Sequence, residues 1–263
     1  MTYSLQLFDD IITNPLKDGV LVIQLNRPNE FNALRTKLLD EIAQVLVRAE
    51  EDENVRCVVL TGNQKAFAAG ADIKEMATKS PVDVLRDPRA ASWKVIRNFK
   101  KPLIAAVNGY CLGGGNELAM HCDIIVAGEN AKFGQPEINL GIIPGAGGTQ
   151  RFTSLLGKSK AMRYVLTGDF MSAKQAYEAG LVAEIFAPEE TLDQAITIAK
   201  KIAQKAPIAV ELAKEAVLKA SDSLLESGLA FERKAFAVLF STSDQKEGAD
   251  AFINKRPPVY KGS

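Results

Sequence analysis

Residues 103–120 read LIAAVNGYCLGGGNELAM, an apolar run followed by three glycines and then by a helical apolar pattern. The run LIAAV has the length of a buried strand, and the residues after the glycines have the period of a helix. Glycines at the start of a helix leave backbone N–H groups free and let a ligand approach the chain closely. The stretch therefore predicts a strand, a turn and a helix with Glu117 in its first turn, where the helix dipole by itself also favours a carboxylate.

Strand-like and helical patterns alternate on both sides of this stretch. Three more runs have strand length and β-branched residues: residues 19–25 (GVLVIQL), 56–62 (RCVVLTG) and 123–128 (DIIVAG). Apolar residues at three- and four-residue steps over residues 38–49 predict an amphipathic helix. Three helical patterns follow Gly180, over residues 192–206, 207–220 and 222–240. The order predicts an α/β core with a helical C-terminal third.

Length and charge limit the classes of function. The 263 residues are near the upper end of what one hydrophobic core supports. Lys and Arg together number 32, as do Asp and Glu, so no net charge attracts nucleic acid. No stretch approaches the ~20 apolar residues of a membrane span, and the opening MTYSLQLFDD has no basic segment followed by an apolar run. We expect a soluble, cytoplasmic protein without a membrane or nucleic-acid partner.

A second run of small residues, FAAGADI at residues 67–73, follows the strand-like run 56–62. Small side chains let a ligand reach the backbone, and the helical pattern KEMA that comes next has free N–H groups at its start. Taken alone, the run is typical of a tight strand-to-helix turn. If a ligand binds next to this run, its free N–H groups predict a backbone site for an oxygen anion.

A third motif, FGQPE at residues 133–137, is followed by NLGIIPGAGGTQR at residues 139–151. Glu137 lies between a proline and an apolar stretch, where burying a carboxylate is costly unless it has a partner or a task. The run GAGGT lacks the Lys-Ser/Thr ending of a phosphate-binding P-loop, so it predicts close backbone packing. The G-x-G-x-x-G spacing of a dinucleotide site is absent from the chain.

Metal-binding and nucleophilic residues are few. His121 is the only histidine and lies near the end of the predicted Glu117 helix, where we expect a structural role. No cluster has the ligand spacing of zinc or iron, so no metal is predicted. Cys57, Cys111 and Cys122 lie in or beside apolar runs without C-x-x-C spacing, and we expect buried free thiols in a reducing compartment.

The three motifs, together with NRP at residues 26–28 and NAL at residues 32–34, resemble the diagnostic motifs of the crotonase (enoyl-CoA hydratase/isomerase) superfamily over nearly the entire chain. The resemblance implies an α/β fold in which a spiral of repeated ββα units, residues 1–190, precedes a helical region, residues 191–263. The helical region is implied to form homotrimer or hexamer contacts and to complete the coenzyme A site. Coenzyme A is part of the acyl-CoA substrate, and no separate cofactor is implied.

The resemblance also implies roles for individual residues. The backbone N–H groups of Ala71 and Gly114 match the oxyanion hole for the thioester carbonyl, and Glu117 and Glu137 match the two catalytic acids of enoyl-CoA hydratases. Further substrate and coenzyme A contacts are implied for Ala33, Leu34, Ala69, Gly70, Asp72, Ile73, Lys74 and Gly113. Asn116 departs from the small or sulfur-containing residue that many members carry before the acid.

Hydration chemistry explains why such residues are needed. Syn addition of water across the C2=C3 bond of a 2-enoyl-CoA, which gives a 3-hydroxyacyl-CoA, places negative charge on the thioester oxygen. Two fixed N–H donors stabilise that charge, and losing one donor typically costs about 3 kcal/mol. Two neighbouring carboxyl groups have separated pKa values, so one accepts a proton from water while the other donates a proton to C2. We assign these roles to Glu117 and Glu137, respectively.

Two alternative functions remain. An enoyl-CoA isomerase commonly lacks one of the two acids, and both are present here. An RNA-binding hydratase homologue needs a basic stripe, and Lys200, Lys201 and Lys205 form only a short cluster in a neutral chain.

Three segments also resemble the 2,3-dehydroadipyl-CoA hydratases of bacterial phenylacetate breakdown: residues 106–120, 140–151 and 247–262. An acyl chain that ends in a carboxylate favours a cation at the far end of its pocket, because a buried unpaired carboxylate is costly. Arg86 and Arg89 lie in a proline-interrupted segment, residues 77–99, that we expect either to cover the pocket or to form a plain surface excursion. They are the candidate cations, and two solvated arginines are the alternative.

Overall fold

The strands of the chain form two β-sheets. The computed structural model describes residues 8–263, and its larger sheet has the order β1-β2-β3-β5-β7-β10 and its smaller sheet the order β4-β6-β8-β9. The strands are β1 (Ile11–Thr13), β2 (Val20–Leu25), β3 (Cys57–Thr61), β4 (Ala66–Ala68), β5 (Leu103–Val107), β6 (Tyr110–Leu112), β7 (Ile124–Gly128), β8 (Lys132–Gly134), β9 (Met171–Ser172) and β10 (Glu184–Phe186).

Helices connect and cover these strands. The helices are η2 (Pro28–Glu30), α1 (Thr36–Glu51), α2 (Ile73–Met76), α3 (Pro81–Leu85), α4 (Arg89–Asn98), α5 (Gly114–His121), η3 (Pro136–Leu140), α6 (Gly148–Leu156), α7 (Lys158–Thr167), α8 (Ala173–Glu178), α9 (Thr191–Ala203), α10 (Pro207–Asp222), α11 (Leu225–Leu239) and α12 (Ser243–Ile253). Pro207 is the first residue of α10, where a proline costs no hydrogen bond.

Three successive units repeat one pattern. In the pairs β3–β4, β5–β6 and β7–β8, the first strand enters the larger sheet, the second enters the smaller sheet, and a helix follows. Neighbouring first strands are parallel, as in the register of Val59 with Ile104 and of Ala106 with Val126. The α/β class and the spiral of ββα units predicted from the sequence are thus confirmed.

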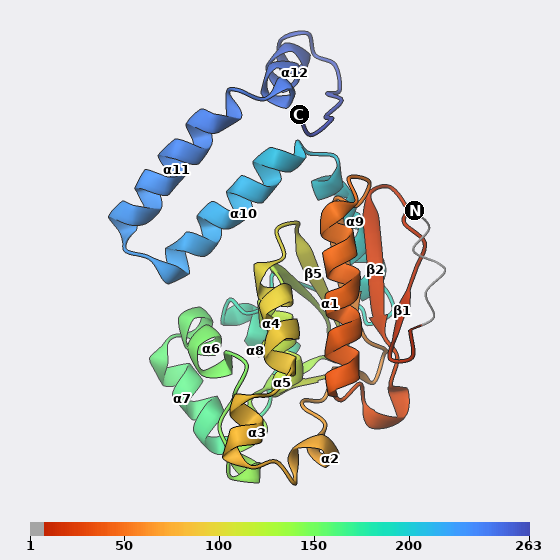
Figure 1. Cartoon of the computed structure of the whole chain (residues 1–263), viewed down its shortest axis with the longest axis vertical. Coiled ribbons are helices and arrows are strands. Elements are labelled where there is room, and N and C mark those ends of the chain that lie inside the picture. Colours follow the sequence, from red (N-terminus) through yellow and green to blue (C-terminus); the bar gives the residue numbers. More distant parts are fainter. Residues whose placement is uncertain (1–7) are drawn as a thin grey trace.

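The larger sheet is buried on both faces, which explains the near-continuous apolar runs of its strands. On one face Leu21 of β2 belongs to the same core as Leu38 and Ile42 of α1, and Figure 1 shows α1 lying along β2. On the other face Val22 packs in a cluster with Ala195 of α9. The helix α9 therefore covers the sheet, although it opens the predicted helical region, and the division into residues 1–190 and 191–263 stays a prediction.

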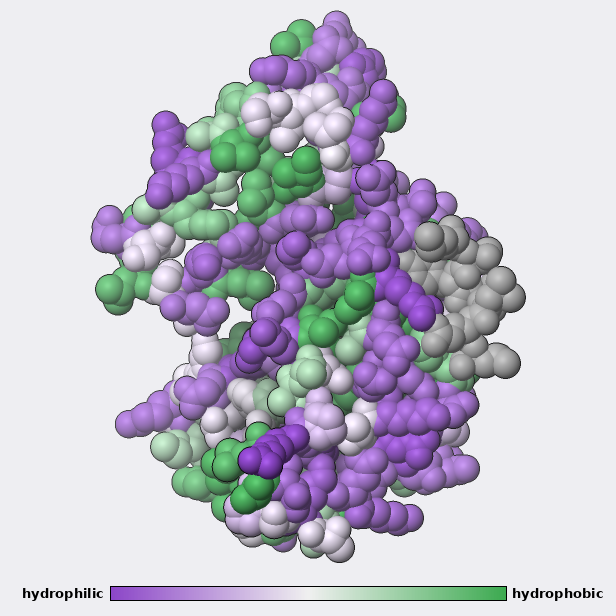
Figure 2. Space-filling view, viewed as in Figure 1, coloured by the Kyte–Doolittle hydropathy of each residue, from purple (hydrophilic) through white to green (hydrophobic). Residues whose placement is uncertain are grey.

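The helices α10 and α11 form an arm that extends from the body, with α12 beyond it (Figure 1). The helix α10 has no buried residue, and α11 buries only Ala235. Val217, Leu224 and Leu225 are 72%, 82% and 75% exposed, and Figure 2 shows apolar side chains gathered over this arm. Residues 8–263 therefore leave an apolar surface of the arm uncovered.

Two further expectations concern burial and membranes. Cys57, Cys111 and Cys122 are buried and free, as predicted, and burial raises the pKa of each thiol. No helix among residues 8–263 is long and apolar enough to cross a membrane. The expectation about the opening residues falls mostly on residues 1–7, outside the described part of the chain.

Candidate active site

Two turns bring two backbone amides close together. Gly113 precedes α5 with φ of +51°, a conformation that other residues rarely adopt, and Gly114 is the first residue of the helix. A Cβ atom placed on Gly114 would lie 3.4 Å from the amide nitrogen of Ala71. Within residues 8–263, neither the Ala71 N–H nor the Gly114 N–H donates a hydrogen bond. Two adjacent free donors at a helix start can bind an oxygen anion.

The backbone of Leu34 holds the Ala71 turn in place. Leu34 forms an isolated β-bridge with Ala71: its N–H donates to the Gly70 carbonyl at 2.7 Å, and its carbonyl accepts from the Asp72 N–H at 3.1 Å. The N–H of Ala69 donates to the carbonyl of Phe31, just before Leu34 in the chain, at 3.0 Å. Four of the predicted substrate contacts, from two separate motifs, therefore lie side by side.

The side chain of Arg27 ties the same two segments together. It donates to the carbonyl of Ala33 and to Asp72 Oδ2, the latter at 3.0 Å. Asp72 also caps α2, because its Oδ1 accepts from the Lys74 N–H at 3.1 Å. Ile73 is 49% exposed and Lys74 is exposed, so both are accessible beside the turn. The arginine of the motif NRP therefore joins the two turns that contain the predicted substrate contacts.

Glu117 is 3% exposed and binds the backbone where the loop after η3 enters α6. Its Oε1 accepts from the N–H groups of Ala146 and Gly148, both at 2.7 Å. Burial raises the pKa of Glu117, and the two N–H groups oppose this rise because they favour the charged form. The carboxylate is therefore held by another loop rather than serving its own helix as a cap.

The same loop shows why GAGGT is rich in glycine. A Cβ atom on Gly148 would lie 2.7 Å from the side chain of Pro144 and 2.9 Å from that of Gln135. The close backbone packing predicted for this run is confirmed. Its contact with Glu117 was not predicted, because it joins residues 31 positions apart.

Glu137 lies on the other side of the Gly113 turn. A Cβ atom on Gly113 would lie 2.9 Å from Glu137 Oε1. Burial, with a smaller contribution from the charge of Glu117, raises the pKa of Glu137 to about 7. With its amide nitrogen facing Glu137, Gln135 donates to Oε1 and Oε2 at 3.1 and 3.2 Å and accepts from Asn116 Nδ2 at 3.2 Å. Gln135 and Asn116 are both fully buried, so Asn116 orients Gln135 and Gln135 in turn holds the carboxyl group of Glu137.

The segment that contains Arg86 and Arg89 is short and helical. Asp87 accepts from Arg89 Nη2 at 2.6 Å and from Lys79 Nζ at 2.5 Å, and these cations hold the pKa of Asp87 well below its usual range. Arg89 is therefore already paired with Asp87. Arg86 is exposed at the end of α3 and has no ion pair with any residue from 8 to 263. Of the two candidate cations, only Arg86 is available to a ligand.

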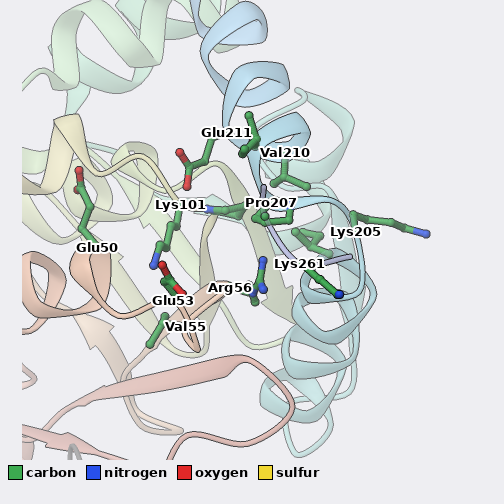
Figure 3. Close-up of a pocket in the computed structure, with 14 residues that line it drawn as sticks. Glu50, Glu53, Val55, Arg56, Lys101, Lys205, Pro207, Val210, Glu211 and Lys261 are labelled. Carbon is green, nitrogen blue, oxygen red and sulfur yellow. The ribbon is translucent and has the colours of Figure 1, made fainter. Parts of the chain in front are cut away.

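A cavity of about 170 Å³ lies elsewhere, between the end of α1 and the start of α10 (Figure 3). Its charged lining residues have both signs: Glu50, Glu53, Glu211, Arg56, Lys101, Lys205 and Lys261. Lys101 is tied to the end of α1, because its Nζ donates to the carbonyls of Ala49 and Asp52 at 2.7 and 2.8 Å. None of the predicted site residues lines this cavity. In the described part of the chain, no group of three His, Cys, Asp or Glu side chains could hold a metal ion.

Comparisons with known proteins show the family of the chain. The family model for enoyl-CoA hydratase/isomerase matches residues 16–263. The chain belongs to the enoyl-CoA hydratase/isomerase family. The mitochondrial enoyl-CoA hydratase of Pongo abelii is 52% identical over 91% of this chain and 83% of its own. The 2,3-dehydroadipyl-CoA hydratase of Escherichia coli (strain K12) is 49% identical over 92% of this chain and 95% of its own.

A solved structure of a relative has the same overall fold. The structure of an enoyl-CoA hydratase subunit from Geobacillus kaustophilus HTA426 has a TM-score of 0.94 and 45% identity, and it covers 97% of this chain and 99% of its own. The family and fold predicted from the sequence motifs are therefore confirmed.

Within this family fold, the structure brings the predicted residues to one place. Ala71 and Gly114 lie together. Glu117 is in the first turn of the helix that begins at Gly114, and Glu137 lies against Gly113. Two kinds of partner were not predicted from the sequence: the side chains that hold the predicted residues, such as Gln135, and the backbone N–H groups that bind Glu117. The motifs FGQPE and GAGGT contain these partners, but only the folded chain shows which atom each one contacts.

Proposed function

We propose that Glu117 and Glu137 act as the base and the acid of a hydration reaction at the Gly113–Gly114 turn. The chain is an enoyl-CoA hydratase, a hydro-lyase that acts on an acyl-CoA thioester. The observation that carries the proposed mechanism is that two differently held glutamates flank one pair of free backbone donors.

The N–H groups of Ala71 and Gly114 form the proposed oxyanion hole. Negative charge builds on the thioester oxygen as water adds, so donors aimed at that oxygen stabilise the enolate more than the bound substrate. Both donors are free within residues 8–263, so binding the oxygen breaks no existing hydrogen bond. The remaining proposed contacts with the thioester and the coenzyme A part are those of the same turns: Ala33, Leu34, Ala69, Gly70, Asp72, Ile73, Lys74 and Gly113.

Glu117 is the proposed base. Its two N–H donors favour the carboxylate, which accepts a proton from water while the water oxygen bonds to C3. Glu137, with a pKa of about 7, retains a proton in a substantial fraction of molecules at neutral pH and donates it to C2. One water is consumed, its elements end on C2 and C3, and exchange with solvent restores both carboxyl groups. The proposed addition is syn.

Substitution of each glutamate tests this division of work. Glu117→Gln and Glu137→Gln should each retain the fold and substrate binding but lose hydration by about 10²–10⁴-fold, the scale of a general acid or base. Loss of absorbance at the enoyl thioester band measures the reaction. Near-normal turnover by either variant contradicts the two-acid mechanism. Incorporation of ¹⁸O from labelled water into the product separates hydration from isomerisation, which consumes no water.

The relatives suggest two kinds of substrate, a general short-chain enoyl-CoA and 2,3-dehydroadipyl-CoA. The more specific proposal is 2,3-dehydroadipyl-CoA. Its support is the similarity to the Escherichia coli hydratase of that name and the exposed Arg86 in the predicted cover segment, residues 77–99. The mitochondrial relative at 52% identity fits a general short-chain hydratase equally. We expect kcat/KM for 2,3-dehydroadipyl-CoA to exceed that for crotonyl-CoA, and Arg86→Ala to narrow the gap. Equal or better turnover of crotonyl-CoA by the unmutated enzyme favours the general hydratase.

The uncovered arm supports a proposed homotrimer, or a hexamer of paired trimers, in which the helical region completes the coenzyme A site. An apolar surface of this kind is stable in water when a second copy covers it. Light scattering should return a mass of three or six times the 28.4 kDa chain. A monomer mass at micromolar concentration contradicts the proposal. The cytoplasmic location stays a prediction.

A further inference from the structure

His121 contacts the same loop that holds Glu117. The two residues are four positions apart in α5, so their side chains lie on one face of the helix, one turn from each other. Glu117 Oε1 accepts from the Ala146 N–H at 2.7 Å, and His121 Nε2 lies 3.1 Å from the Ala146 carbonyl oxygen. The helix therefore holds Ala146 through both of its peptide groups.

The contact determines the protonation of the imidazole. A carbonyl oxygen only accepts, so Nε2 must carry the hydrogen and donate it. Nδ1 is then an acceptor, and it is buried without a partner among the described residues. The histidine thus has one hydrogen bond in its buried surroundings, and that bond goes to Ala146.

The elements around His121 keep it neutral. Trp93 of α4 packs against the imidazole, with ring centroids 5.2 Å apart. Two cations act on it, Arg151 from α6 and Arg97 from α4, and no carboxylate among residues 8–263 offsets them. Burial and these cations lower the pKa of His121 to about 4, so it does not change charge in the neutral range. The donor at Nε2 is therefore permanent under conditions in which the enzyme works.

We propose that His121 is a positioning residue for Glu117: by donating to the Ala146 carbonyl, it fixes the loop whose Ala146 and Gly148 N–H groups hold the carboxylate. The inference rests on the proposed role of Glu117 as the base. It differs from the structural helix-end role expected from the sequence, because the imidazole acts on a second loop and through a single atom. A side chain that only fills space would not need that donor.

Two substitutions of similar size separate the donor from the volume. His121→Leu fills the space without a donor, while His121→Gln keeps an amide N–H at a comparable reach. We expect His121→Leu to lower kcat by roughly three- to tenfold, the effect of one weakened hydrogen bond, with KM nearly unchanged. The acidic limb of the pH profile of kcat/KM should move to higher pH. The reason is that the charged form of Glu117 is less well stabilised while the neighbouring Glu137 is unchanged, so the pKa of Glu117 rises. His121→Gln should keep the wild-type kcat and profile.

Two outcomes overturn the proposal. One is an unchanged kcat and acidic limb in His121→Leu. The other is an equal loss in both variants that follows a lower melting temperature, as a merely structural role predicts. Glu117→Gln is measured beside them: near-normal turnover in that variant refutes the role of Glu117 itself. An inactive Glu117→Gln with an unaffected His121→Leu refutes only the positioning role.

Discussion

Replacing Gly113 with alanine tests how closely the site is built around a residue that lacks a side chain. Gly113 has φ of +51°, and its added Cβ would lie 2.9 Å from Glu137 Oε1. The substitution therefore combines backbone strain with a contact against one catalytic candidate. The two effects act on different quantities, and this allows them to be measured separately.

Strain lowers stability, and the contact lowers activity. A residue forced into a sparsely populated backbone region costs about 1–3 kcal/mol of the free energy of unfolding. The contact adds little to that cost, because Glu137 Oε1 is the far end of a flexible side chain and moves aside. Displacing a reacting group by ~1 Å costs about 10²-fold in rate. We therefore expect kcat to fall about a hundredfold while most of the protein stays folded.

Gly157→Ala is the matched control. Gly157 has φ of +76°, and nothing lies within 4 Å of its added Cβ. It should show a similar loss in urea denaturation but nearly normal kcat in the enoyl thioester assay. If Gly113→Ala keeps wild-type kcat, or if the control loses as much activity, the proposed fit between Gly113 and Glu137 is wrong.

Glu137 has a folded pKa of about 7 against an ordinary 4.5, so the wild type should lose stability relative to Glu137→Gln as pH rises from 4.5 through 7, by at most about 3 kcal/mol in urea denaturation at fixed protein concentration; a constant difference contradicts the raised pKa. Asp87→Asn should lower the free energy of unfolding by roughly 2–3 kcal/mol at pH 7, because Arg89 loses its carboxylate partner; an unchanged value shows that the pair is energetically neutral. Gly148→Ala should reduce kcat with little change in KM, since its Cβ displaces the loop that holds Glu117; normal kcat would show that the loop adjusts freely.

The main strands could be predicted because each is a long apolar run. The expected strand at residues 56–62 is Cys57–Thr61, and the expected strand at residues 123–128 is Ile124–Gly128. The strands of the smaller sheet, such as Ala66–Ala68, have at most three residues, too few to show a period. Their pairing depends on contacts between distant segments, which no local pattern contains.

The site was predictable at the level of residues but not of contacts. The glycines and the two glutamates stand in motifs that mark them, and their chemistry is specific. The hydrogen-bond partners of Glu117 could not be predicted, because they are backbone N–H groups, which every residue except proline carries. The charge of Arg89 makes it a candidate for binding a substrate carboxylate. Its hydrogen bond to Asp87 depends on the local turn, which the sequence does not show.

Parallel neighbours in the larger sheet are separated along the chain by whole crossovers, from β2 to β3 and from β3 to β5. Non-local pairing of this kind folds slowly, because chain entropy is lost before contacts form. During synthesis, Glu117 emerges before Ala146 and Gly148, so its carboxylate has no N–H partners until the loop after η3 has left the ribosome. A nascent chain that ends within η3 therefore contains Glu117 but not the contacts that hold it, and reaction competence arises late in the order of assembly.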